Sequence, residues 1–283
     1  MSISIRDPAS TAPAKPSQAT EARVSRIRFG GTIWRASQSL MFPLLIVLVW
    51  SAASAQGWVS PKILPSPATI AGTFWDLLAG GDIGTNLGIS LVRVAKGFVI
   101  GGSLGLALGI AMGFSRTAEI WIGPLFRTIS QIPSLVWIPL LMQLFGIDEM
   151  LKLVIMVKAC LIPIAITSSE GIRSIPRHYL EVAQVLGLSR RARIVKIVLP
   201  GALPSIFSGL RQGLSYVWVS LVIVEMMVSA EGIGYLMSWG RLLFQLDVVI
   251  VCMILVGVIG FSLDFGLQRL EARCLRWRGA GAP

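Results

Sequence analysis

The chain has 283 residues, of which 54% are hydrophobic and only 14% are charged, and its mean hydropathy is +0.75. Soluble globular proteins carry about 25% charged residues. A water-soluble body with this composition would expose large apolar patches, so an ordinary soluble domain is excluded. The net charge of +11 alone would also suit a nucleic-acid binder. Lys and Arg lie mainly between the apolar runs, however, as they do in membrane proteins, and we expect no nucleic-acid partner.

The N-terminal segment, residues 1–38, is polar and rich in Pro, Ser and Ala. No small-residue cleavage site follows the first apolar run, so the segment does not resemble a cleaved signal peptide. We predict a flexible tail on the cytoplasmic side of the membrane.

Six apolar stretches are long enough to cross a bilayer, which takes about 20 helical residues. They are residues 40–56, 87–113, 120–145, 150–169, 204–228 and 246–267. The fourth is the least uniform, because Lys152, Lys158 and Pro163 interrupt it. A short amphipathic helix is expected near residues 68–79, outside the membrane. The pattern predicts an all-α polytopic membrane protein with six transmembrane helices.

The positive residues of the short loops predict the orientation of these helices. Basic residues gather in the N-terminal tail, in the connection between the fourth and fifth spans, and after the sixth span. They include Arg23, Arg26, Arg28, Arg35, Arg173, Arg177, Arg190, Arg191, Arg193, Lys196, Arg269, Arg273, Arg276 and Arg278. Six spans place all three regions on one side, so both termini are predicted to be cytoplasmic.

Glycines recur every fourth residue on the second span, at Gly101, Gly105, Gly109 and Gly113. Such a stripe lets another helix approach closely in a membrane. No Gly-Lys-Ser/Thr follows these glycines and no strand precedes them, so they do not form a nucleotide-binding loop. We predict a helix-packing face.

The sequence offers little for an enzyme. Its one histidine, His178, lies in the cytoplasmic loop, and no zinc-binding or nucleophile-elbow motif is present. Intramembrane Glu225 and Asp264 are expected toward opposite faces of the membrane. The three cysteines show no metal spacing, and we interpret Cys160 and Cys252 as packing residues. We therefore predict no catalytic residue and no metal site. A membrane enzyme or an ATP-independent secondary transporter remains the alternative from another class.

The cytoplasmic segment 171–200 has the pattern of a helix-turn-helix outside the membrane. It reads Glu181-Val182-Ala183, then Gly187, and ends Ile197-Val198-Leu199-Pro200. Ala183 is small enough for close docking, Gly187 permits a tight turn, and Glu181 can pair with a positive charge. This spacing resembles the EAA loop of type I ABC importer permeases, with Val182 in place of the usual second small residue. The coupling residues that the resemblance implies are Glu181, Ala183, Gly187, Ile197, Leu199 and Pro200.

The resemblance extends from about residue 40 to the region of Trp277. It is carried by Ser90-Leu91-Val92-Arg93, Trp137-Ile138-Pro139-Leu140, Phe145-Gly146-Ile147-Asp148, Leu199 to Ser205 and Gly232 to Leu236. These runs are similar to the nitrate, sulfonate and taurine permeases, and most of all to the aliphatic-sulfonate branch. The implied division is a tail over 1–38, a first transmembrane helix with an outer segment over 39–83, a type I permease domain over 84–268, and a basic cytoplasmic C-terminus over 269–283.

The resemblance also implies partners and a substrate class. We expect two ABC ATPase subunits that hold ATP and Mg²⁺, a second copy of the permease, and a periplasmic or lipid-anchored solute-binding protein. The chain itself is expected to hold no cofactor and to lie in a bacterial cytoplasmic membrane, surrounded by lipid. Alternating access would move a small organic anion, with an aliphatic sulfonate favoured. Nitrate, taurine, or another small anion or heterocycle is the alternative.

Several ionisable and aromatic residues are predicted to share the outer half of the membrane, and intramembrane charges are functional candidates. A rise of 1.5 Å per residue places Arg93, Lys96 and Lys158 about 9–14 Å from the outer helix ends. We hypothesise an anion pathway lined by Arg93, Lys96, Pro133, Trp137, Lys158, Trp218 and Glu225. One alternative stays open: Arg93 and Lys96 reach out to the interface, and Lys158 pairs with Glu225. In sulfonate-type permeases the position of Lys158 is usually apolar, which points to a different anion.

Overall fold

The computed structural model describes residues 41–42, 44–58, 60 and 63–276. The chain divides into two units, Met1–Pro61 and Lys62–Pro283. Within the first unit, the described residues contain a short apolar helix, Leu44–Ala55. The predicted tail 1–38 and the residues from 277 onward lie outside the described residues.

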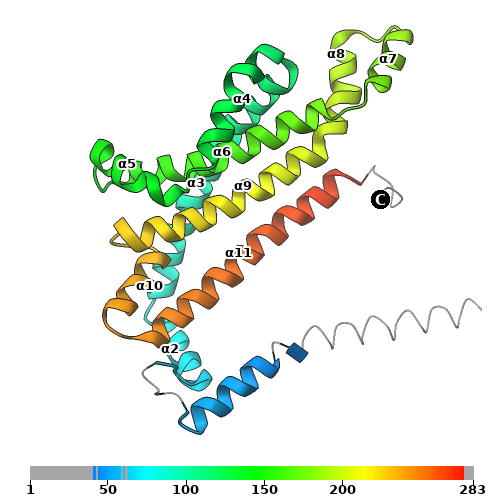
Figure 1. Ribbon diagram of the computed structural model, residues 1–283. Coiled ribbons are helices and arrows are strands. Elements are labelled where there is room, and N and C mark those ends of the chain that lie inside the picture. Colours follow the sequence, from blue (N-terminus) through cyan, green and yellow to red (C-terminus); the bar gives the residue numbers. More distant parts are fainter. Residues whose placement is uncertain (1–40, 43, 59, 61–62, 277–283) are drawn as a thin grey trace, which may run out of the picture. The chain divides into compact units, whose positions relative to one another are not determined.

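Every regular element among the described residues of the second unit is a helix or a helical turn (Figure 1). Its elements are α2 (Pro67–Ala79), α3 (Asp82–Phe114), α4 (Arg116–Ser130), the 3-10 turn η1 (Ser134–Trp137), α5 (Ile138–Phe145), α6 (Glu149–Arg173), α7 (Arg177–Val185), α8 (Arg190–Arg193), the π-helical turn η2 (Ile194–Val198), α9 (Leu199–Val228), α10 (Ile233–Leu242) and α11 (Leu246–Cys274). The prediction of an all-α membrane protein is confirmed.

Four continuous helical stretches are long and apolar enough to cross a membrane. They are Asp82–Phe114, Glu149–Arg173, Arg190–Val228 and Leu246–Cys274. A fifth candidate is a bent pair, Arg116–Ser130 with Ser134–Phe145, whose axes differ by 96°. The described part of the chain therefore offers four or five candidate spans beside the shorter helix Leu44–Ala55.

The stretch 120–145, predicted as one of six spans, is not a single straight helix. The helix ends at Ser130, and Pro133 has extended backbone angles, φ −54° and ψ 144°. Proline supplies no N–H to a helix and disfavours helical geometry in the residue before it, so the chain turns at this point. A run of apolar residues reflects hydropathy alone, so it does not reveal a break in the helix.

The glycine stripe of α3 packs against α6, as predicted. A Cβ added at Gly101 would lie 2.7 Å from the Val157 carbonyl oxygen, and one at Gly105 would lie 2.6 Å from that of Leu161. At Gly109 the corresponding distance, to the Ala165 carbonyl oxygen, is 2.8 Å. The two helices therefore approach backbone to backbone, and a side chain on the stripe would force them apart.

The predicted helix-turn-helix of segment 171–200 is present as α7 followed by α8 and η2. Gly187 lies in the turn at φ +68°, the left-handed conformation that glycine adopts without steric penalty. Helices α7 and α8 lie at one end of the bundle, and α5 and α10 lie at the other (Figure 1). The bundle thus places the basic loop at the end opposite α10 and its flanking turns.

Candidate functional site

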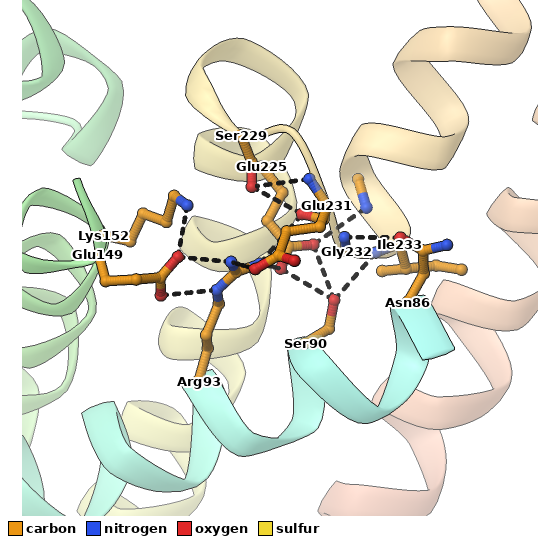
Figure 2. A network of polar contacts seen from close by, with 11 residues as sticks. Asn86, Ser90, Arg93, Glu149, Lys152, Glu225, Ser229, Glu231, Gly232 and Ile233 are labelled. Carbon is orange, nitrogen blue, oxygen red and sulfur yellow. Dashed lines mark hydrogen bonds and ion pairs between the residues drawn. The ribbon is translucent and has the colours of Figure 1, made fainter. Parts of the chain in front are cut away.

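Arg93 of α3 is the centre of a polar network between α3, α6 and α9 (Figure 2). Its Nε donates to Glu149 at 2.9 Å, and its Nη2 donates to Glu149 at 2.5 Å and to Glu231 at 2.8 Å. Its Nη1 donates to Glu225 at 2.8 Å and to the Glu231 carbonyl oxygen at 3.0 Å. Each of the five guanidinium N–H groups therefore has an acceptor, and the Arg93 side chain is held in one place.

Glu225 of α9 is fully buried and is also completely hydrogen-bonded. Besides Arg93, its carboxylate accepts the Ser90 hydroxyl, which lies 2.9 and 2.8 Å from the two oxygens, and the Gly234 N–H at 3.0 Å. The Ser90 oxygen in turn accepts the Ile233 N–H at 2.9 Å. This arrangement satisfies a carboxylate that would otherwise be very costly to bury.

The same network fixes the loop that joins α9 to α10. Asn86, one helical turn before Ser90, accepts the Gly232 N–H at 2.8 Å. Gly232 has φ +106°, and a Cβ there would lie 2.3 Å from the Glu225 carboxyl group. Asn86, Ser90 and Arg93 lie along one side of α3 and together hold the start of α10 (Figure 2).

A cavity of about 600 Å³ lies on another face of the bundle, between the α4–η1 connection, α6 and α9. Among the described residues, Lys158 is the only charged side chain in its wall. Its ammonium group donates to the Ile132 carbonyl oxygen at 3.1 Å and lies 4.9 Å from the centre of the Trp137 ring. The remaining polar wall residues are Ser130, Gln131, Ser134, Thr167, Gln212, Tyr216 and Ser220.

The structure distributes the hypothesised pathway residues over separate places. Lys158 and Pro133 line the cavity, and Trp137 lies against Lys158. Lys96 is exposed on α3 outside the cavity wall. Trp218 is buried, donates its indole N–H to the Val256 carbonyl oxygen at 3.1 Å, and borders a smaller hollow between α9 and α11.

Arg93 and Glu225 differ most from the hypothesis, because both are buried in the ion-pair network and neither lines the cavity. The Arg93 side chain nevertheless reaches toward the helix ends, because its partners Glu149 and Glu231 expose 61% and 54% of their side chains. The proposed pairing of Lys158 with Glu225 is wrong, because Glu225 pairs with Arg93 and Lys158 contacts Ile132 and Trp137.

Sequence reasoning missed Glu149 and Glu231 as partners of Arg93, and Ser90 as a partner of Glu225. Glu149 begins α6, and Glu231 precedes the glycine that starts α10. The predicted topology places both glutamates near an intramembrane arginine. This proximity is the signal that could have identified them as its partners.

The coupling residues are placed on and around α7 and at the start of α9. Glu181 is exposed, whereas Ala183 is only 1% exposed. The expectation that Ala183 offers a small docking surface is therefore corrected, because the small side chain is needed for packing within this chain. Ile197 lies in η2, and Leu199 and Pro200 form the first turn of α9. The exposed apolar surface of this region comes instead from Val182, Val185 and Leu186.

Together these features define a polytopic helical membrane protein with a bent helix pair, a buried charge network and a basic helix-turn-helix at one end. The structure is similar to a chain of the MetNI methionine ABC transporter in an inward-facing crystal form. The TM-score is 0.54 at 18% identity, covering 72% of this chain and 98% of that chain. This similarity shows that the two chains share a fold.

The chain belongs to the family described as binding-protein-dependent transport system inner membrane component, whose profile matches residues 101–276. It is 42% identical to a protein of Escherichia coli named as the aliphatic sulfonates transport permease protein SsuC, over 84% of this chain and 90% of the relative. It is 34% identical to a Bacillus subtilis protein of the same name, over 96% of this chain and 97% of the relative. The chain is therefore a multi-pass membrane permease of the ABC transporter class.

Proposed function

We propose that this chain is the membrane subunit of an ATP-driven importer for a small organic anion, with an aliphatic sulfonate favoured. The observation that carries the proposal is the similarity, over nearly the whole length of the chain, to permeases named for aliphatic sulfonates. The cavity with Lys158 as its one charged wall residue among the described residues is compatible with an anionic substrate.

ATP hydrolysis would take place on two separate ATPase subunits that hold ATP and Mg²⁺, and this chain would hold no cofactor. The proposed contact is the helix-turn-helix of α7, α8 and η2. Val182, Val185 and Leu186 expose 56%, 87% and 70% of their surface there, beside the exposed Glu181. Exposed apolar side chains grouped on one extramembrane helix are typical of a protein-protein contact.

The proposed membrane arrangement has six crossings, with Leu44–Ala55 in the first and the bent pair of α4 with η1 and α5 in the third. The excess of Arg and Lys around α7, α8 and the end of α11 supports a cytoplasmic location for both termini. Two identical copies would form the permease in a bacterial cytoplasmic membrane. A periplasmic or lipid-anchored binding protein would deliver the substrate.

Co-purification and uptake test this proposal. The full chain, expressed with candidate ATPase and binding-protein subunits from the same organism, is expected to bring down a Walker A-containing subunit. The complex in vesicles should accumulate radiolabelled butane-1-sulfonate only when ATP and the binding protein are present. Competition by taurine, nitrate and bicarbonate decides between the favoured substrate and its alternatives. ATP-independent uptake, or no recruited ATPase, would contradict the proposal and favour a secondary transporter or a membrane enzyme.

A further inference from the structure

We infer that the cavity between the α4–η1 connection, α6 and α9 is an anion-binding site on the transport path, with Lys158 as the residue that recognises the charge. This inference rests on the proposed importer function and assigns a place and a chemical class to its substrate. The ligand would be an amphiphilic anion, with a compact anionic head and a short alkyl part.

The first argument is the unusual state of Lys158. A lysine within an apolar helix is costly and pairs with another ionisable group or with backbone carbonyl oxygens. Arg93 has acceptors for all five N–H groups, and Arg211 pairs with Asp264 at 3.0 Å. Lys158, in contrast, makes no ion pair with a described residue. Its contacts among the described residues are the Ile132 carbonyl oxygen and the Trp137 ring. An ammonium group has three donors, so donors remain for a ligand.

A second donor without a partner lies beside it. The indole N–H of Trp137 is buried and has no acceptor among the described residues. The same ring lies 4.9 Å from the Lys158 ammonium group. A buried N–H without an acceptor is unfavourable. Trp137 itself does not line the cavity, so the donor that a ligand with oxygen atoms can reach is the Lys158 ammonium group, which the Trp137 ring contacts.

The rest of the wall supplies the chemistry for an organic group. Ile162 and Pro163 follow Lys158 along α6, and Val219 and Ile223 face the cavity from α9. Its volume of about 600 Å³ lies within the range of small-molecule sites, roughly 300–1,000 Å³. An alkyl chain would lie against these side chains while its anionic head meets Lys158. Nitrate and bicarbonate have no apolar part, so this wall favours an alkanesulfonate or alkanecarboxylate.

Cysteine modification tests the site without relying on the affinity of the binding protein. Cys160, Cys252 and Cys274 are replaced, and Ile162→Cys places a reporter one helical turn from Lys158. The full chain with its ATPase, in nanodiscs, is treated with 2-sulfonatoethyl or 2-(trimethylammonium)ethyl methanethiosulfonate. We expect Lys158→Met to lower the ratio of anionic to cationic modification rates about tenfold, because a nearby positive charge in a low-dielectric site attracts the anionic reagent.

Matched controls separate charge from structure. Lys158→Arg should keep the ratio, and Lys96→Met, which removes an exposed lysine outside the cavity, should leave it unchanged. Butane-1-sulfonate should slow modification, whereas the neutral butane-1-sulfonamide should not. Recruitment of the ATPase reports whether each variant is folded. If Lys158→Met does not fold, Lys158→Gln removes the same charge and takes its place in the experiment.

An unchanged ratio in the charge-loss variant, or equal protection by the sulfonamide, overturns the inference. A second reporter, Ser134→Cys, measures the same ratio from the opposite wall, and cysteines unreactive at both positions contradict an accessible site. If uptake remains ATP-dependent while the ratio does not respond to Lys158, the site is wrong and the importer function stands. If no ATPase is recruited by the unmodified chain, the proposed function itself fails.

Discussion

The guanidinium group of Arg93 and the carboxylate of Glu225 lie 2.8 Å apart between α3 and α9, and Glu225 exposes none of its surface. They are 132 positions apart in sequence, and both α4 and α6 lie between them. The pair also holds the start of α10, because the same carboxylate accepts the Gly234 N–H. A charge used in this way stabilises the helix arrangement and is not free to attract an anion.

Removal of Arg93 should be more harmful than removal of the Glu225 charge. Arg93→Met leaves a buried carboxylate without its counter-ion, which typically costs about 3–5 kcal/mol. Glu225→Gln keeps an oxygen acceptor for Gly234 and buries no charge of its own. We expect Arg93→Met to lower the thermal unfolding temperature of the purified chain strongly and Glu225→Gln to lower it less.

The double variant Arg93→Met/Glu225→Gln provides the control for this prediction. It removes both buried charges, so it should be more stable than Arg93→Met alone. A double variant at least as unstable as the sum of the two single variants would mean that the pair does not interact as described.

Gly232 is predicted to be intolerant of any side chain. Gly232→Ala would combine an unfavourable φ of +106° with a Cβ 2.3 Å from the Glu225 carboxyl group. Gly81 provides a matched control, because it also precedes a helix with positive φ, +83°, but has no atom within 4 Å of its added Cβ. Gly81→Ala should cost only the backbone strain, about 1–2 kcal/mol.

Thermal unfolding of both glycine variants separates strain from the steric clash. We expect Gly232→Ala to unfold at a clearly lower temperature than Gly81→Ala. Equal decreases in unfolding temperature would show that the loop moves away from Glu225 without cost. The tight contact in the structure would then contribute nothing to stability.

The sequence was most informative where the physical cause is local. Glycines spaced by four fall on one side of a helix whatever lies opposite, and the left-handed turn at Gly187 depends on its own backbone. The break at Pro133 was missed because an apolar average over 120–145 contains no information on backbone hydrogen bonds. The partners of Arg93 were missed for another reason. Residue depth can be counted along a helix, but the direction in which a side chain faces depends on how distant helices pack.

The close contact between α3 and α6 predicts a strong effect at Gly105. An added Cβ would lie 2.6 Å from the Leu161 carbonyl oxygen and 3.1 Å from the Ile164 Cβ, so Gly105→Ala should separate the helices and destabilise the chain. Gly257 of α11 has no atom within 4 Å of an added Cβ. Gly257→Ala should therefore be neutral or stabilising, since alanine favours a helix over glycine by about 1 kcal/mol. Thermal unfolding in the same nanodiscs measures both, and a tolerated Gly105→Ala would contradict the backbone contact.

The exposed apolar surface of α7 predicts a variant that loses its partner while keeping its fold. Val185 exposes 87% of its surface and therefore contributes little to packing within the chain, so Val185→Asp should leave the thermal unfolding temperature nearly unchanged. If α7 docks on the ATPase, the new charge would be buried in that contact without a counter-ion, and recovery of the ATPase by affinity purification should fall at least about tenfold.

Phe244→Asp is the matched control, because Phe244 is 88% exposed in the turn between α10 and α11, away from α7. That variant should recruit the ATPase normally. Equal recovery with Val185→Asp and Phe244→Asp would remove α7 as the docking surface, because an interface that includes Val185 cannot accept an unpaired carboxylate without losing affinity.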